Sequence, residues 1–129
     1  MKTAVLLVGH GSKEPYNKET IEFFSSKLKD KYDFVASAFM QINEPTIPEM
    51  LEKAADAGVG KILVVPVFLS KGIHIDCDIP GILGLKRGER KGKITAGGRE
   101  ITLVYGEPFG KDLRLLEIIK DRIASAEMQ

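Results

Sequence analysis

The sequence predicts an α/β fold, a three-layer sandwich in which helices cover both faces of a four-stranded, mainly parallel sheet. Three observations support this class. Apolar runs alternate with amphipathic segments along the chain, which is typical of strand–helix–strand units joined by right-handed crossovers. The apolar runs are continuous and rich in β-branched residues, as in strands buried on both faces. The length, 129 residues, suits a single domain over residues 1–129.

The first half of the chain contains two predicted strands and the helix between them. Ala4–Val8 is the first strand, and Phe34–Met40 is the second. Ser12 is placed to cap a helix that begins near Glu14–Pro15, because proline is tolerated in a first turn. The apolar residues of this helix recur at helical spacing: Ile21, Phe24 and Leu28.

A second helix and a third strand follow. Thr46 and Glu49 fit a capping box, and glycines at 58 and 60 end the helix. Its apolar stripe consists of Ile47, Met50, Leu51, Ala54 and Ala55. Ile62–Leu69, the most apolar segment of the chain, is the third strand.

The last part of the chain contains a fourth strand at Ile101–Tyr105 and a closing helix. That helix is marked by Leu113, Leu116, Ile119 and Ile123. Between the third and fourth strands, the glycine-rich, basic stretch Gly81–Arg99 interrupts the alternation. We expect a short helix there, followed by a mobile loop or an exposed hairpin.

Composition excludes several classes of function. Nineteen basic and eighteen acidic residues leave a formal charge of +1, without the basic excess of a nucleic-acid-binding protein. The longest apolar runs are too short to span a bilayer. No cleavage site follows the first apolar run, so we expect a cytoplasmic protein. The single cysteine, Cys77, excludes an internal disulfide and agrees with a reducing compartment.

Both histidines of the chain follow predicted strands. His10 lies in a Gly-His-Gly-Ser turn after the first strand, and His74 follows the third strand. Ligands of open parallel sheets bind beyond the carboxyl ends of the strands, so both histidines fall at the expected functional edge. Glu44 follows the second strand at the same edge.

Simpler interpretations of these residues remain open. Each histidine can be an ordinary hydrogen-bonded loop residue, and Glu44 a loop carboxylate before a proline. Asp76 and Asp78 can be caps of the next turn or ligands, and Cys77 a small buried thiol or a neighbour of His74 on one helical face. The basic run at 86–93 can be a solvated loop or can attract a substrate with many carboxylates.

Imidazole suits two chemical tasks at such an edge. It is a ligand for cobalt, nickel, iron and zinc, and it accepts protons at cellular pH. Insertion of a metal into a tetrapyrrole needs both, because two pyrrole protons leave as the metal enters. A phosphate site at the His10 turn is a weaker alternative, since the chain has neither a Walker A motif nor a dinucleotide fingerprint. The G-x-S-x-G motif of serine hydrolases is also absent.

Three segments carry a family resemblance: Val8–Ser12 (VGHGS), Ala38–Thr46 with its Asn-Glu-Pro-Thr end, and Pro66–Pro80 with its H-x-x-x-D-I-P end. With Tyr105–Gly110 (YGEPFG), they resemble the class II chelatases, in particular the short archaeal-type CbiX sirohydrochlorin cobaltochelatases. The resemblance covers nearly the whole chain. It implies a chelatase-like single lobe, wound as in flavodoxin, and a lyase that inserts Co2+, or in related pathways Ni2+ or iron, into sirohydrochlorin.

The resemblance also implies roles for individual residues. His10 is the expected proton acceptor and metal ligand, and His74 the second metal ligand. The substrate-binding positions are Glu44 and the loop Leu69, Ser70, Lys71, Gly72, Ile73 and His74. The metal is a substrate, no permanently bound cofactor is expected, and two copies form a homodimer around the macrocycle.

Two features depart from the family pattern. Gln41 stands where many relatives have a carboxylate, and the stretch after Leu85 has no counterpart that can be aligned. The alternatives to a cobaltochelatase of anaerobic cobalamin synthesis are a non-catalytic metal or tetrapyrrole carrier and an iron chelatase of sirohaem synthesis.

Overall fold

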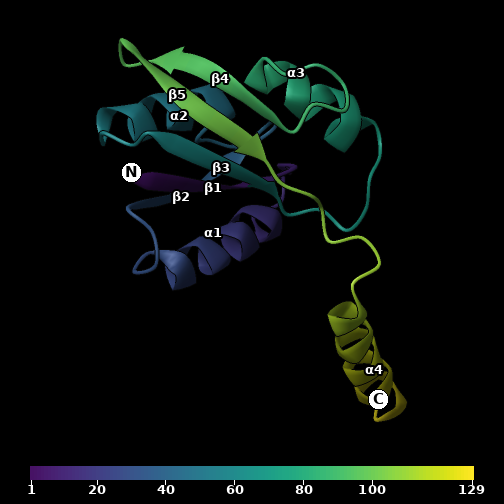
Figure 1. Cartoon of the computed structure of the whole chain (residues 1–129). Coiled ribbons are helices and arrows are strands. Elements are labelled where there is room, and N and C mark those ends of the chain that lie inside the picture. The colour runs from purple at the N-terminus through teal and green to yellow at the C-terminus, as the bar shows by residue number, and fades with distance from the viewer.

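The computed structural model describes all of residues 1–129 and has the predicted α/β architecture (Figure 1). A five-stranded sheet has the order β2-β1-β3-β5-β4. Its strands are β1 (Thr3–Gly9), β2 (Phe34–Phe39), β3 (Lys61–Pro66), β4 (Lys91–Ala96) and β5 (Arg99–Tyr105). β1 pairs in parallel with both β2 and β3, β3 pairs in parallel with β5, and β4 is antiparallel to β5. The carboxyl ends of the four parallel strands therefore lie at one edge.

The helices lie on opposite faces of the sheet. They are α1 (Tyr16–Leu28), α2 (Ile47–Asp56), the π-helical turn η1 (His74–Asp78), α3 (Ile79–Leu83) and α4 (Leu113–Glu127). α2, η1 and α3 cover the face with the larger core, and α1 covers the other face. We call the sheet with α1, α2, η1 and α3 the lobe.

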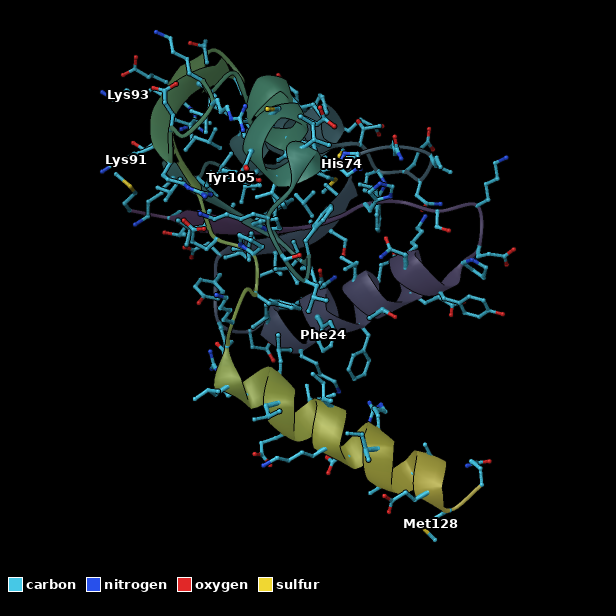
Figure 2. The ribbon with its side chains drawn as sticks, turned by 90° about the vertical axis from the view of Figure 1, so that its right-hand side faces the viewer. Phe24, His74, Lys91, Lys93, Tyr105 and Met128 are labelled. Atoms are coloured by element: carbon cyan, nitrogen blue, oxygen red, sulfur yellow. The ribbon has the colours of Figure 1, made fainter.

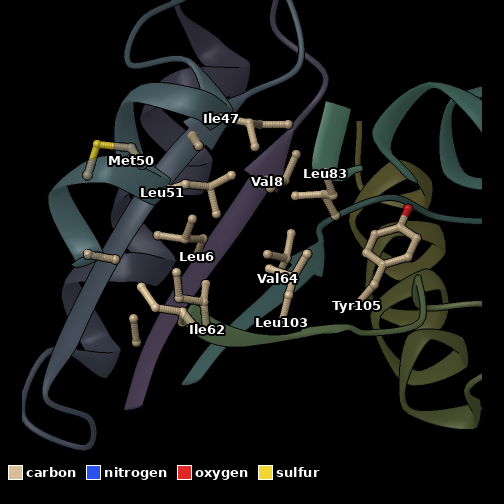
Figure 3. Close-up of a cluster of buried hydrophobic side chains, with 14 of the residues drawn as sticks. Leu6, Val8, Ile47, Met50, Leu51, Ile62, Val64, Leu83, Leu103 and Tyr105 are labelled. Atoms are coloured by element: carbon tan, nitrogen blue, oxygen red, sulfur yellow. The ribbon is translucent and has the colours of Figure 1, made fainter. Parts of the chain in front are cut away.

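The two cores follow from the alternation of side chains along β1. Leu6 and Val8 point into the larger core, where they meet Ile62, Val64 and Leu103 of neighbouring strands and side chains of α2 and α3 (Figure 3). Val5 and Leu7 point to the α1 side, where the buried cluster has only four members. The larger core therefore contributes most of the apolar burial that holds the lobe together.

The structure corrects the expected number of strands. Gly81–Arg99 contains α3 and then β4, so the exposed hairpin is the correct alternative and the sheet has five strands rather than four. Gly97 and Gly98 form the two-residue turn of the hairpin, with φ of 59° and 75°. Such a turn needs positive φ at both central positions, which glycine supplies without strain.

Of the two predicted helix N-caps, the cap of α2 forms and the cap of α1 does not. The Thr46–Glu49 capping box of α2 is confirmed, with both of its reciprocal hydrogen bonds. The prediction that Ser12 caps α1 is wrong: α1 begins after Pro15 without a side-chain cap, and the Ser12 hydroxyl instead accepts a hydrogen bond from the Glu14 amide. A serine can satisfy a nearby turn amide just as well as a helix amide, so the sequence signal was ambiguous.

The closing helix exists as predicted, but it does not complete the sandwich. α4 extends away from the lobe, with Met128 near its far end (Figure 2), and none of its residues is buried. No helix is long and apolar enough to cross a membrane.

Tyr105, at the end of β5, connects the sheet to the segment that carries His74. Its hydroxyl donates a 2.8 Å hydrogen bond to the carbonyl oxygen of Ile75, and its ring is 2% exposed. Burial raises the pKa of Tyr105 to about 12, against the opposite effect of the Arg90 guanidinium that lies over the ring. The neutral phenol is therefore part of the folded structure.

The buried phenol predicts an alkaline loss of stability. In the unfolded chain a tyrosine ionises near pH 10, whereas Tyr105 in the folded chain ionises near pH 12. The unfolded state thus loses its proton first, so the free energy of unfolding should fall between pH 10 and 12. The Tyr105→Phe variant should not show this part of the decline. At pH 7 its free energy of unfolding should be about 1–2 kcal/mol lower than that of the wild type, because the Ile75 carbonyl loses its hydrogen-bond donor.

Urea unfolding of both proteins from pH 7 to 12 measures this difference. The gap between wild type and Tyr105→Phe should narrow above pH 10. A constant gap over the whole range would show that the Tyr105 phenol does not ionise differently in the two states.

Candidate metal and tetrapyrrole site

The Gly9–Ser12 turn fixes His10 at the carboxyl edge of the sheet. Gly11 has φ of 92°, and a Cβ atom placed there would lie 1.8 Å from the carbonyl oxygen of Gln41. The Gly11 amide donates to the Asn17 side chain, and the Ser12 amide donates to the Asn43 side chain at 2.8 Å. The turn therefore depends on close backbone approach to the loop after β2.

The loop after β2 lies directly against this turn. The amides of Met40 and Gln41 donate to the carbonyl oxygens of Gly9 and His10, at 3.0 and 3.3 Å. Ile42 has φ of 67°, which is rare for a β-branched residue, and its side chain is 60% exposed. The Ile42 side chain therefore lies at the surface and not in the core.

The structure brings the two histidines together. Nε2 of His10 lies 3.4 Å from Nε2 of His74, and the ring centroids are 4.8 Å apart at an interplanar angle of 72°. The rings come from loops 64 residues apart in sequence. Both histidines therefore lie at the carboxyl edge of the sheet, as expected, and their Nε2 atoms are adjacent.

Hydrogen bonds at Nδ1 define the tautomer of each ring. Nδ1 of His10 is 2.9 Å from the Gly11 carbonyl oxygen, and Nδ1 of His74 is 2.7 Å from an Asp78 carboxylate oxygen. Each partner can only accept, so each Nδ1 carries a proton, and in the neutral form of each ring Nε2 keeps its lone pair. Two lone pairs face each other, which is an unfavourable arrangement that a cation between them would relieve.

The distance between the two nitrogens suits a shared ion. Two imidazole nitrogens at about 2.0–2.1 Å from one tetrahedrally coordinated ion are separated by about 3.3–3.4 Å. The observed 3.4 Å agrees with that value. The distance between the two nitrogens therefore allows both to ligate one divalent ion.

The remaining predicted candidates do not join this pair in a ligand set. No group of three or more His, Cys, Asp and Glu side chains is arranged to hold a metal, so Glu44, Asp76 and Cys77 do not complete a ligand set with the histidines. Glu44 is exposed, and Asp76 and Cys77 are half-buried in η1. Asp78 is not a side-chain cap of α3, because its carboxylate accepts from His74 instead.

The expected substrate loop, Leu69 to His74, borders the pair. Leu69 and Ile73 are 69% and 61% exposed, Ser70 and Gly72 are exposed, and Lys71 lies 3.9 Å from the Glu107 carboxylate. The loop leads into η1, where His74 and Asp78, four residues apart, are in contact. Single π-helical turns are often found at functional sites.

Two contacts of His10 escaped the sequence analysis. The ring of Phe68 packs against His10 edge-on, with centroids 6.1 Å apart, and the Gln41 amide lies 3.4 Å from Nε2 of His10. The sequence singles out Gln41 only because it stands where many relatives have a carboxylate. No periodicity of the sequence indicates either contact, because both depend on how the three loops meet.

Fold and site together define a protein of the metal-handling α/β class, in which two imidazoles face each other at the open end of a parallel sheet. The model of the CbiX family matches residues 4–126, and the chain belongs to this family. It is 41% identical to the sirohydrochlorin cobaltochelatase of Methanopyrus kandleri, over 95% of this chain and 96% of that protein. It is 43% identical to the sirohydrochlorin cobaltochelatase of Methanothermobacter thermautotrophicus, over 97% and 93%.

A solved structure shows the same fold. The sirohydrochlorin chelatase SirB of Bacillus subtilis subspecies spizizenii, in complex with cobalt, superposes with a TM-score of 0.77 at 26% identity. The match covers 97% of this chain but 51% of SirB. This chain therefore corresponds to about half of that protein.

The backbone contact at Gly11 predicts a position-specific effect of an added methyl group. Gly11→Ala should lower the free energy of unfolding by about 3 kcal/mol or more, because φ is positive and the new Cβ meets the Gln41 carbonyl. Gly81→Ala is the matched control: Gly81 lies in α3 with open space around it, so the change should be neutral or stabilising by up to about 1 kcal/mol. Urea unfolding of both variants tests this, and equal stabilities would contradict it.

Proposed function

We propose that this chain is a sirohydrochlorin cobaltochelatase, which inserts Co2+ into the tetrapyrrole sirohydrochlorin. The observation that carries the proposal is the pair of Nε2 lone pairs, 3.4 Å apart, at the open carboxyl edge of the sheet. The names of the archaeal relatives, which match over nearly their whole length, support the same activity.

The ligand set suits a metal that must be released. Structural zinc sites close around their ion with four protein ligands. Here two neutral imidazoles hold the ion, and its remaining positions stay open for water or for pyrrole nitrogens. We infer that the macrocycle nitrogens replace these ligands as the metal passes into the ring.

Metal insertion releases two protons from the pyrrole nitrogens: His10 is placed to accept one, and the other passes to water at the open edge of the site. Once Co2+ leaves Nε2 of His10, that lone pair is free, while Nδ1 remains bonded to the Gly11 carbonyl. Gln41 can donate its amide hydrogen to the same nitrogen between turnovers, since it lies 3.4 Å away. His10 is therefore the proposed ligand and base, and His74 the proposed ligand.

The surroundings of the pair fit a flat macrocycle with a charged rim. Ile42, Leu69 and Ile73 expose 60–69% of their surfaces in the two loops that flank His10, which suits contact with the apolar ring face. Lys71 is exposed in the same region and can pair with carboxylates of the substrate. We assign substrate binding to Glu44 and to the loop from Leu69 to His74, as the resemblance implies.

We also propose a working unit of two copies in the cytoplasm. One lobe presents one face to a planar macrocycle, and a second copy would cover the other face. The single thiol, Cys77, is half-buried and suits a reducing compartment.

Replacement of either histidine should remove the activity. His10→Ala and His74→Ala should each lower the rate of cobalt insertion at least about 100-fold, because each loses a ligand and His10 also loses its role as base. Both should keep the far-UV circular dichroism of the wild type, since both side chains lie at the surface edge of the lobe. The absorbance change of sirohydrochlorin with Co2+ measures the rate.

The same assay decides between the alternatives. Wild-type protein that binds sirohydrochlorin and Co2+ without raising the rate above that of the free mixture would be a carrier. Faster insertion of Fe2+ or Ni2+ in a direct competition would reassign the metal. Full activity of either alanine variant would contradict the assigned roles.

Asp78 should act as a positioning residue through His74. Asp78→Ala removes the acceptor of the Nδ1 hydrogen, so the Nε2 lone pair is no longer fixed, and Co2+ affinity should fall about 10–100-fold. Asp78→Asn keeps an oxygen that accepts this hydrogen and should restore most of the affinity. Titration with Co2+, followed by its visible absorption bands, measures the dissociation constant.

A purely structural role of Asp78 would give a different pattern. It would lower thermal stability and kcat in parallel with the affinity for Co2+. The proposed role raises the KM for Co2+ with a smaller effect on kcat. Unchanged Co2+ affinity of Asp78→Ala would refute it.

A further inference from the structure

Residues 105–110, the segment after β5, lie along the expected substrate loop. The amides of Phe109 and Gly110 donate to the carbonyl oxygens of Phe68 and Leu69, at 3.0 and 2.8 Å. At the start of the segment, the buried phenol at the end of β5 donates to η1. These contacts hold the segment against both ends of the loop, and the proposed function gives the segment no role.

Glu107 is the only charged side chain of this segment, and two cations share its carboxylate. Nη2 of Arg90, from the stretch before β4, lies 3.0 Å from a carboxylate oxygen. Nζ of Lys71, from the substrate loop, lies 3.9 Å from the other oxygen. One carboxylate thus connects the substrate loop to the basic run at 86–93.

The Arg90 side of this arrangement is fixed. The guanidinium also donates to the Gly106 carbonyl oxygen at 3.1 Å and lies over the Tyr105 ring, 5.0 Å from its centroid. The Arg90 side chain is 33% exposed. Because three partners hold the guanidinium, the Glu107 carboxylate beside it is held in position as well.

The Lys71 side can exchange its partner. The Lys71 side chain is 63% exposed, and a separation of 3.9 Å is at the limit of an ion pair. Such exposed pairs are weak, since water solvates both charges and the long lysine side chain loses freedom in the pair. A carboxylate of a ligand can therefore replace Glu107 at the Lys71 ammonium, whereas Glu107 stays with Arg90.

The Glu107 carboxylate opposes this replacement. A ligand carboxylate that approaches Lys71 competes with Glu107 for the ammonium and is repelled by the Glu107 charge. The two cations and the one carboxylate leave a single positive charge, and loss of the carboxylate would double it. Glu107 therefore lowers the affinity of the loop for a ligand that carries many carboxylates.

We propose that Glu107 limits the affinity of the site for its substrate by competing with substrate carboxylates for the Lys71 ammonium. Arg90 is the residue that positions Glu107. The proposal rests on the proposed function, because it takes the substrate to be a tetrapyrrole with a rim of carboxylates. The product has the same rim, so the competition also favours product release.

Removal of the charge at Glu107 should tighten substrate binding. Glu107→Gln keeps the shape of the side chain, and its dissociation constant for sirohydrochlorin without metal should be about 5-fold lower than that of wild type at low ionic strength. This difference should disappear in about 0.5 M salt, which screens exposed charges. Quenching of the tetrapyrrole fluorescence measures the dissociation constant. A merely structural role of Glu107 would give the opposite sign, because a disturbed loop binds more weakly.

Two further variants locate the effect. Glu100→Gln removes the same charge from an ion pair with Lys93, at the opposite end of β5, and should leave the dissociation constant unchanged. Lys71→Gln should weaken the binding of sirohydrochlorin, because a cation of the loop is lost. In the Lys71→Gln background, Glu107→Gln should have no further effect, since the two residues act on the same ligand carboxylate.

The outcomes separate this proposal from the proposed function. Unchanged or weaker binding by Glu107→Gln would overturn the proposal alone if wild type inserts cobalt. Equal tightening by Glu100→Gln, or tightening that persists without Lys71, would also overturn it. Tightening in a protein that binds sirohydrochlorin but inserts no metal would support the proposal and contradict the chelatase. A wild type that does not bind sirohydrochlorin would overturn both.

Discussion

The parallel pairing of β1 between β2 and β3 is the constraint on which the rest of the structure depends. This pairing places the carboxyl ends of three strands at one edge, so the turn at His10, the loop at Gln41 and the loop that leads to His74 meet there. Backbone contacts between Gly11 and Gln41 then leave no room for a side chain. The site thus depends on strand register as much as on its two imidazoles.

The chemistry of the site depends on the small number of protein groups that can ligate a metal ion. Hydrogen bonds from the two Nδ1–H groups to the Gly11 carbonyl and the Asp78 carboxylate fix both tautomers, so two lone pairs converge without a third protein ligand. A carboxylate or thiolate added to the pair would strengthen binding but slow transfer. The geometry therefore suits an ion in transit more than one held for structure.

Much of this arrangement is predictable from local patterns, and the rest is not. Continuous apolar runs predict the parallel strands, Thr46 and Glu49 predict the start of α2, and the glycine-containing turns predict the functional edge. Contacts between distant loops, such as Phe68 or Gln41 with His10, depend on three-dimensional register that no period encodes. The position of α4 also could not be predicted from the sequence, because the apolar residues of a helix have the same spacing whichever surface covers them.

The sheet also has a charged margin at β4. Lys91 and Lys93 of this edge strand are exposed, and Lys93 pairs with Glu100 across the hairpin (Figure 2). Lysines on an edge strand discourage another sheet from adding to it, because the approaching backbone would have to desolvate them. A chain with exposed apolar helix surface is otherwise at risk of open-ended polymerisation. The charged margin thus makes the β4 edge a poor template for fibre growth through strand addition.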